Sequence, residues 1–140
     1  MVFPREHSEG VFADTFYWIA LTSPTEAAYE RANQVTDDIV TIDEVLTEYL
    51  TFFSAASEYV RRKTAKNVQQ ILLDLSVYVI PQTRESFLSG LDLYASRPDK
   101  GYSLTDCISM QTMRREGLTD ALTNDKHFEQ EGFRALFRDS

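Results

Sequence analysis

Short apolar runs rich in β-branched residues alternate with longer helical segments along this chain, and this alternation constrains the fold more than any other feature. Five runs are expected to be strands: residues 10–15, 38–41, 77–81, 120–123 and 133–137. Segments of helical period separate them, the clearest at residues 16–21, 59–75, 87–95 and 103–117. Strands that alternate with helices in this way form a parallel sheet covered by helices on both faces. The fold class is therefore α/β, and ligands of such a sheet bind at the carboxyl ends of its strands.

Two short motifs predict where further helices begin. In "SPTE", Ser23 is expected to cap a helix that has Pro24 at its first position. In "TIDE", Thr41 and Glu44 form a predicted capping box. The helix over residues 59–75 is expected to bury one apolar side, which is made of Val60, Val68, Ile71, Leu72 and Leu75.

The length and composition are those of an ordinary globular domain. The 140 residues suffice for one core, so we expect a flexible leader at residues 1–10 and a single domain over residues 11–140. No apolar run approaches the roughly 18 residues that span a bilayer, and the first ten residues lack the apolar stretch of a secretory signal. Cys107 is the only cysteine, which excludes an internal disulfide and is usual in a reducing compartment. We therefore expect a cytoplasmic protein with no membrane partner.

The net charge of −8 argues against non-specific attraction to nucleic acid or to an anionic membrane. It is compatible with a local basic stripe that contacts phosphates and with an acidic pocket that binds divalent cations. The 22 acidic residues therefore have to be judged one by one.

Three aspartates occupy positions where a carboxylate has a structural use. Asp14 ends the first expected strand and Asp125 the fourth, each before a helix, so each suits an N-cap. Asp106 follows Ser103 by three residues, which is a Ser-x-x-Asp capping pattern near the start of a helix. Taken singly, each of these aspartates is more often structural than functional.

Glu48 lacks such an explanation. It lies one turn after Glu44, in phase with Val45, Tyr49 and Phe52, where a glutamate is rarely buried without a partner. Its side chain either extends from the edge of the core to water or belongs to a functional site. The sequence leaves open whether Glu44 or Glu48 is the second acid of that site.

The four acids are expected to meet at one edge of the sheet. Asp14 and Asp125 follow strands at that edge, and the helices that carry Glu48 and Asp106 start from it. Carboxylates so close to one another raise at least one pKa unless a cation lies between them. Oxygen ligands without histidine or cysteine suit Mg²⁺ or Mn²⁺ rather than zinc. Two such ions can promote the hydrolysis of a phosphodiester, so the pattern predicts a metal site for that chemistry.

Taken together, the stretches that carry these acids resemble a PIN domain, the nuclease family that includes the VapC-type toxins of bacterial toxin–antitoxin pairs. The resemblance covers the chain from about Val11 to Phe137. Its four parts are "VFADT" with Asp14, "TIDEVLTEYL" with Glu48, "YSLTDCISM" with Asp106 and "ALTNDKHFEQEGF" with Asp125.

The resemblance implies a three-layer α/β/α sandwich with a central parallel sheet of four to five strands, and metal-dependent cleavage of single-stranded or structured RNA. It implies Mg²⁺ or Mn²⁺ as the cofactor, an antitoxin protein as a partner laid across the cleft, and a homodimer. We expect Asp14 and Asp106 to hold the main ion directly, with the other two acids bound through water or to a second ion. The implied catalytic and metal-binding carboxylates are Asp14, Glu48, Asp106 and Asp125, supported by the hydroxyls of Thr15, Ser103 and Thr123.

A basic run on the expected exposed side of one helix is a candidate for contacts with RNA phosphates, although a solvated helix face is the commoner meaning of such a run. Neither histidine is expected to act in catalysis, because His7 lies in the expected leader and His127 on a short surface helix. The basic run consists of Arg61, Arg62, Lys63 and Lys66.

Two other functions fit parts of the same pattern. A metal-dependent phosphohydrolase would use Asp14 as its nucleophile, with Lys126 and Thr123 as the nearest match to the lysine and hydroxyl that such sites need. A non-catalytic PIN-like binding module is the other alternative, and the presence of all four acids counts against it.

Overall fold

The computed structural model describes residues 10–138, so the leader expected at residues 1–10 lies, apart from Gly10, outside the described residues. The strands are β1 (Val11–Ala13), β2 (Ile39–Ile42), β3 (Val77–Ile80), β4 (Asp120–Leu122) and β5 (Arg134–Ala135). The helices are α1 (Thr15–Thr22), α2 (Tyr29–Asn33), α3 (Asp43–Phe52), α4 (Glu58–Leu73), α5 (Arg84–Ser96), α6 (Leu104–Glu116) and α7 (Lys126–Gln130).

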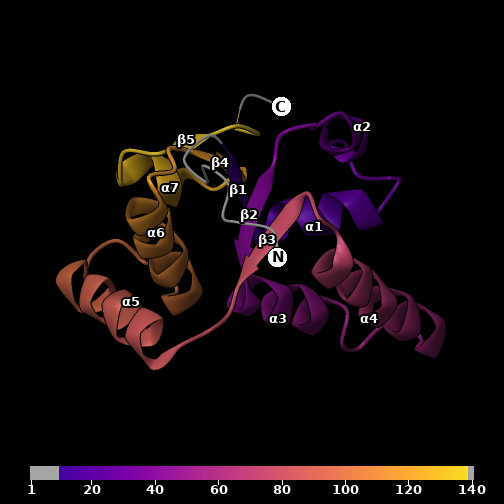
Figure 1. The fold of residues 1–140 in the computed structure, drawn as a ribbon, viewed down its shortest axis with the longest axis horizontal. Helices are drawn as coiled ribbons and strands as arrows, with labels where there is room; N and C mark the ends of the chain where they lie inside the picture. The colour runs from indigo at the N-terminus through magenta and orange to yellow at the C-terminus, as the bar shows by residue number, and fades with distance from the viewer. Residues whose placement is uncertain (1–9, 139–140) are drawn as a thin grey trace.

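The five strands form one parallel sheet in the order β3-β2-β1-β4-β5. Helices cover both of its faces, and in Figure 1 α5 and α6 lie on one side while α1 and α4 lie on the other. The predicted three-layer sandwich with four to five parallel strands is therefore confirmed. The chain runs outward from β1 to β3 and then returns to the other side of β1 as β4, so the strand order reverses between β1 and β4. Open α/β sheets bind ligands at such a point.

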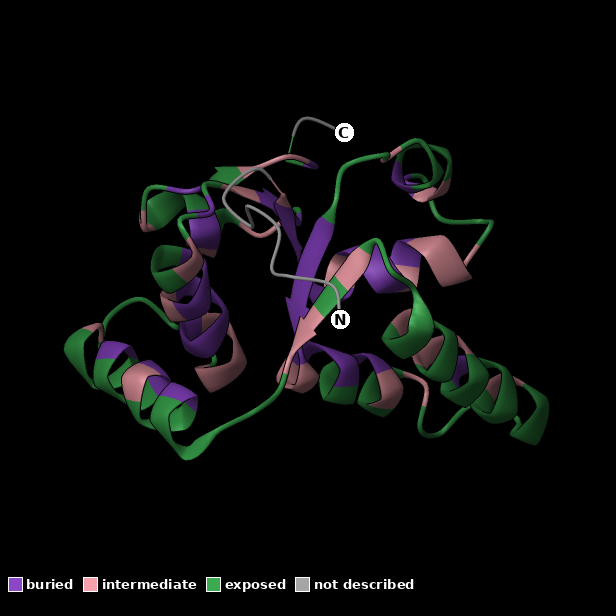
Figure 2. Ribbon diagram, viewed as in Figure 1, coloured by how far each residue is buried: buried purple, intermediate pink, exposed green. Residues whose placement is uncertain are grey.

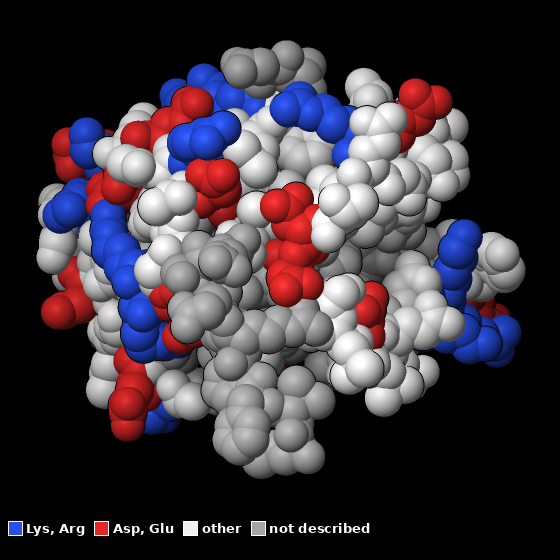
Figure 3. All heavy atoms as spheres, turned by 45° about the horizontal axis from the view of Figure 1, so that its top comes forward, with Lys and Arg blue, Asp and Glu red and all other residues white. Residues whose placement is uncertain are grey.

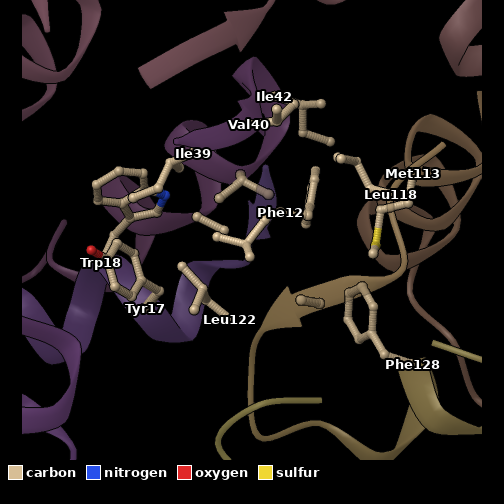
Figure 4. Packing of buried hydrophobic residues seen from close by; sticks show 14 of the residues in the cluster. Phe12, Tyr17, Trp18, Ile39, Val40, Ile42, Met113, Leu118, Leu122 and Phe128 are labelled. Atoms are coloured by element: carbon tan, nitrogen blue, oxygen red, sulfur yellow. The ribbon is translucent and has the colours of Figure 1, made fainter. Parts of the chain in front are cut away.

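The core is centred on β1 and its two neighbours. Every residue of β1 and β2 is buried, because strands covered on both faces carry continuous apolar runs rather than an alternating pattern. In the register of the sheet, Phe12 lies opposite Val40 of β2 and Ala121 of β4. Figure 4 shows Tyr17 and Trp18 packed to one side of these strands, and the methionine and phenylalanine side chains contributed by α6 and α7 packed to the other.

The edge formed by β3 and α4 is much more exposed than this centre, and most of α4 is green in Figure 2. Leu72 is 56% exposed and Leu75 80%, so the prediction that both lie on a buried side is wrong. Val68 and Ile71 of the same predicted side are half-buried. The reason is that α4 packs against α3 and the edge strand β3, so only a narrow stripe of the helix meets apolar partners.

The helix start predicted at Ser23 is wrong, and the helix predicted at "TIDE" is present from Asp43 but lacks the predicted capping box. Ser23 ends α1 instead of beginning a helix, because its N–H donates to the carbonyl oxygen of Ile19, and the next helix starts only at Tyr29. Thr41 lies inside β2, and its Oγ1 donates to the carbonyl oxygen of Ala13 at 2.8 Å instead of capping α3. A hydroxyl buried in a strand takes a neighbouring carbonyl as its partner because no water is available there.

The surface mixes both signs of charge. Figure 3 shows acidic and basic side chains interspersed over one face, with a basic group at its right-hand end, where α4 lies in Figure 1. Within residues 10–138, no helix is both long and apolar enough to cross a bilayer.

Candidate metal centre

The turns after β1 and β4 lie next to each other because these strands are parallel neighbours. Asp14 directly follows β1 and is the N-cap residue of α1, while Asp125 follows β4 and is the N-cap residue of α7. The carboxylates of Glu48, from α3, and Asp106, from α6, are close enough to act electrostatically on Asp14. Asp125 acts in the same way on Asp106. The structure therefore brings the four predicted acids to one edge of the sheet.

Asp14 has the most buried carboxylate of this group. Only 7% of the residue is exposed, and its side chain makes no capping hydrogen bond to α1, so capping does not account for it. Thr123, from the turn after β4, donates its Oγ1 proton to Asp14 Oδ2 at 2.8 Å. Burial raises the pKa of Asp14 to about 7, and repulsion from Asp106 and Glu48 adds to the rise. Hydrogen bonds from the Thr123 hydroxyl and from the Thr15 backbone act against this rise and offset it only in part.

Glu48 is held beside Asp14 by the first residue of α1. Thr15 Oγ1 donates to Glu48 Oε1 at 2.6 Å. Glu44, one turn earlier on α3, is half-buried, and burial raises the pKa of its carboxyl. Both glutamates line a cleft of about 330 Å³. Of the two, Glu48 is therefore the one that acts on Asp14, while Glu44 lines the approach to the site.

Asp106 serves both its helix and the acidic group. Its N–H donates to Ser103 Oγ at 3.0 Å, and its Oδ2 accepts from the Ser103 N–H at 3.1 Å, so the predicted capping pattern is confirmed. Burial raises the pKa of Asp106, the Ser103 hydrogen bond lowers it, and the charge of Asp125 raises it again. The oxygen that accepts the Ser103 N–H, Oδ2, is also the one that faces His127 Nδ1 at 3.4 Å.

Asp125 also caps its helix, since its Oδ1 accepts the N–H of His127 at 2.9 Å. Its own N–H donates to Thr123 Oγ1 at 3.1 Å. The Thr123 hydroxyl, which donates to Asp14 as described, therefore links the two aspartates that follow the neighbouring strands. About a third of the Asp125 side chain is exposed, so this acid lies at the open side of the site.

His127 is the residue of this group that sequence reasoning missed. Its Nδ1 lies 3.4 Å from Asp106 Oδ2 and 3.4 Å from Asp125 Oδ1. One ligand atom from each of the three residues lies within 4.8 Å of the others. His127 lies on the predicted short surface helix, α7, but its side chain is only 21% exposed because it faces the acids. The available signal was the Asp-x-His spacing directly after a strand, which places an imidazole beside a capping carboxylate.

The donor chemistry of these residues fits a hard divalent cation. Burial and mutual repulsion raise the pKa of both Asp14 and Asp106, and a bound dication relieves both effects by neutralising the carboxylates. Carboxylate oxygens supported by hydroxyl groups are the ligands that Mg²⁺ and Mn²⁺ prefer.

The four basic residues predicted to contact RNA do not join this group. All of them are exposed on α4, which packs on α3 and β3 and lies across the molecule from α6 and α7 in Figure 1. Arg62 forms an ion pair with Glu58 one turn earlier, and Arg61 donates to the carbonyl oxygen of Ser54.

A second shielded carboxylate, that of Glu131, is linked to this group through Tyr102 but has cationic partners. Arg97 Nε donates to it at 2.9 Å, Arg114 Nη2 at 2.7 Å and the Tyr102 hydroxyl at 2.8 Å. Burial acts to raise the pKa of Glu131, but these three hydrogen bonds outweigh it and lower the pKa to about 2. The Tyr102 ring also meets the His127 ring edge-on, with 5.1 Å between the centroids.

Comparisons with known proteins agree with this architecture. A family model described as "PIN domain" matches residues 11–133. The chain is also similar to the crystal structure of Mycobacterium tuberculosis VapC20, which is described as a Sarcin-Ricin loop cleaving toxin. That match has a TM-score of 0.78 and 23% sequence identity, and it covers 89% of this chain and 96% of VapC20. At this identity the likeness concerns the fold. No curated protein matches the sequence.

Proposed function

The chain belongs to the PIN domain family, and from this premise we propose that it is a metal-dependent endoribonuclease that cleaves single-stranded or structured RNA. The observation that carries this proposal is the carboxylate of Asp14, which is buried beside Asp106 and Glu48 and has a pKa raised to about 7. A group of this kind is stable in its ionised form when a dication lies among the oxygens.

The proposed cofactor is Mg²⁺ or Mn²⁺. When bound, such an ion supplies a Lewis acid that promotes the ionisation of water and neutralises charge on a phosphodiester. The chain itself holds the ligand oxygens: Thr123 orients Asp14, Thr15 orients Glu48, and Ser103 orients Asp106. The proposed catalytic and metal-binding residues are Asp14, Glu48, Asp106 and Asp125.

A groove beside the acids is the proposed path of one RNA strand. Glu44, Gln82 and Thr105 line both the cleft that contains Glu48 and a larger hollow of about 530 Å³. The larger hollow reaches Arg84 on α5, whose guanidinium lies 5.4 Å from the centroid of the neighbouring Phe87 ring. A guanidinium and an aromatic face offer contacts to a phosphate and to a base, respectively.

The basic face of α4 is a second and separate candidate for RNA contacts. Replacing its four basic residues by glutamine is expected to weaken RNA binding and to flatten the dependence of affinity on salt, because fewer counterions are released. An unchanged salt slope would exclude this face from the RNA interface. The residues are Arg61, Arg62, Lys63 and Lys66.

We further propose that the chain is the toxin of a toxin–antitoxin pair, that a protein antitoxin restrains it, and that it forms a homodimer. The family membership and the likeness to VapC20 support the first two points. Four apolar side chains on α5 are between 38% and 52% exposed, and protein partners commonly cover such surfaces. Light scattering of the purified protein tests the homodimer directly. The four side chains are Phe87, Leu88, Leu91 and Tyr94.

The nuclease proposal is tested by incubating the purified protein with a pool of single-stranded RNAs and with a sarcin–ricin-loop hairpin, in Mg²⁺, in Mn²⁺ and in excess chelator. Internal cuts are expected with either ion, and none in the chelator. If neither ion supports cleavage of any RNA, the proposal is wrong. A stable phosphoenzyme at Asp14 would instead favour the phosphohydrolase alternative.

Two variants make this assay specific to the site. Asp106→Asn removes a proposed ligand but keeps an oxygen that can accept the Ser103 N–H, so it is expected to fold and to lose cleavage. Asp92→Asn, on the exposed side of α5, is the matched control and is expected to cleave normally. RNA binding without cleavage by the unchanged protein would favour the binding-module alternative.

A further inference from the structure

The imidazole of His127 joins two acids that come from different helices. Asp106 belongs to α6 and Asp125 caps α7, and His127 Nδ1 lies 3.4 Å from one oxygen of each. The atom therefore faces the space between the two carboxylates rather than either carboxylate alone.

These two distances are long for hydrogen bonds, although the contact with Asp106 Oδ2 still qualifies as a weak one, and they are also compatible with shared coordination of one ion. A hydrogen bond between a ring nitrogen and a carboxylate is usually about 2.7 to 3.2 Å long, and both observed distances are longer. Two ligand atoms that each lie about 2.1 Å from one ion, at angles between tetrahedral and octahedral, are roughly 3.0 to 3.5 Å apart. One ligand atom from each of the three residues lies within 4.8 Å of the others, so the three residues are close enough to share one ion after side-chain adjustment.

The ring of His127 is held in place from two sides. Its backbone N–H donates to Asp125 Oδ1 at 2.9 Å, and its neighbour Phe128 is fully buried, which anchors the start of α7. The Tyr102 ring packs edge-on against the imidazole, with 5.1 Å between the centroids. The nitrogen donor is therefore preorganised, which is a common property of metal ligands in proteins.

We propose that His127 Nδ1 is a protein ligand of the metal site, together with Asp106 and Asp125, and that this nitrogen makes the site prefer Mn²⁺ to Mg²⁺. The inference rests on the proposed function, because it concerns the same site. It extends that function by adding a nitrogen donor to a group otherwise made of oxygens. Imidazole binds transition metals well, whereas Mg²⁺ is held almost entirely by oxygen ligands and water.

The first test measures the affinity of the chain for Mn²⁺ and for Mg²⁺ by isothermal titration calorimetry, with no RNA present. His127→Gln is expected to weaken Mn²⁺ binding by about 10- to 100-fold and Mg²⁺ binding by less than about threefold. His7→Gln changes the only other histidine of the chain and is the matched control, with both affinities unchanged. Circular dichroism melts confirm that each variant is folded, and His127→Asn repeats the measurement with a shorter side chain.

The second test detects the nitrogen ligand directly. With Co²⁺ in place of Mn²⁺, an imidazole bound through Nδ1 carries its exchangeable proton on Nε2, and this proton gives a strongly shifted proton resonance. One such resonance is expected in the unchanged protein and in His7→Gln, and none in His127→Gln. A role limited to hydrogen bonding with the two aspartates would not produce this signal.

The outcomes separate the two proposals. If the unchanged protein binds neither Mn²⁺ nor Mg²⁺, both the proposed function and this inference fail. If it binds Mn²⁺ but His127→Gln binds Mn²⁺ equally well, or if the shifted resonance is absent, only the inference fails. Weaker Mn²⁺ binding in His127→Gln, together with the loss of the resonance, supports the inference.

Discussion

Two carboxylates of this molecule are shielded from solvent but have opposite electrostatic surroundings. Asp14 is 7% exposed, and its pKa is raised to about 7. The Glu131 side chain is 5% exposed, and its pKa is lowered to about 2. Burial alone acts in the same direction on both groups, because it disfavours the charged form. The opposite outcomes come from the neighbours, together with the deeper burial of Asp14.

The neighbours of Glu131 complete an ion-pair network, whereas those of Asp14 do not. Glu131 accepts hydrogen bonds from Arg97, Arg114 and Tyr102. Asp14 accepts one from the Thr123 hydroxyl and is repelled by other carboxylates. The comparison teaches that Glu131 has the partners of a structural ion pair, whereas Asp14 has none among the described residues and would be stabilised by the dication that we propose.

The largest expected effect concerns cleavage. Asp14→Asn is expected to reduce RNA cleavage by at least roughly a hundredfold to a thousandfold, because a neutral amide binds a dication poorly and gives less stabilisation to the reacting phosphate. The rate is measured under single-turnover conditions in Mn²⁺ and Mg²⁺. Asp92→Asn is the control, and undiminished cleavage by Asp14→Asn would remove Asp14 from the site.

The same substitution is expected to stabilise the metal-free protein. The pKa of Asp14 is raised in the folded state, so the folded protein binds a proton at this carboxylate more tightly than the unfolded chain does. The free energy of unfolding therefore falls as the pH rises from about 4 to about 7. Asparagine has no such cost, so the free energy of unfolding of Asp14→Asn should be higher by roughly 2 to 4 kcal/mol at pH 8 and nearly unchanged at pH 4. Urea denaturation in chelator at both pH values measures this. An equal effect at the two pH values would contradict it.

Glu131→Gln is expected to destabilise the protein, which is the opposite of the effect expected for Asp14→Asn. The lowered pKa of Glu131 means that its stabilising contribution is present above about pH 4.5 and is lost as the pH falls toward 2. The substitution should therefore lower the free energy of unfolding by roughly 2 to 3 kcal/mol at pH 7, and by much less at pH 3. The neighbouring Glu129, which pairs with Arg138 and is 45% exposed, provides the control variant Glu129→Gln. Equal costs for the two variants at pH 7 would show that burial adds nothing to the Glu131 network.

The smallest expected effect is on stability and comes from Tyr102, the uncharged residue of the Glu131 network. Tyr102→Phe removes one hydrogen bond to Glu131 while both arginines remain, so the free energy of unfolding should fall by about 1 kcal/mol. The melting temperature measured by circular dichroism should fall by a few degrees. A loss as large as that of Glu131→Gln would mean that the hydroxyl, rather than the arginines, stabilises the carboxylate.

The sequence predicted the sheet well and the exposed helical surfaces poorly. Buried strands such as β1 carry continuous apolar runs whose meaning depends little on context. The exposure of Leu72 depends instead on which elements reach α4, and Leu75 lies beyond the end of this helix at Leu73, so both are properties of the assembled chain. The helix expected to begin at Ser23 failed for a related reason, because the hydrogen bond from this residue to Ile19 extends the preceding helix and competes with a new start.

The candidate site, too, could be predicted from the sequence only in part. The four acids could be named from the sequence because parallel strands bring their carboxyl ends to one edge, so position in the chain predicts position in the site. The place of His127 could not be named, because its distance from Asp106 depends on how α6 and α7 pack together. The choice between Glu44 and Glu48 likewise depends on a hydrogen bond from Thr15 across 33 residues of chain.

By itself, the sequence determined the order of the elements and the parallel sheet, and it named the candidate acids, because each follows from local pattern and from the chirality of strand–helix–strand units. Only the tertiary structure decided the protonation tendencies of Asp14 and Glu131, because a pKa depends on burial and on charges that are distant in the chain. Only the tertiary structure placed an imidazole among the carboxylates.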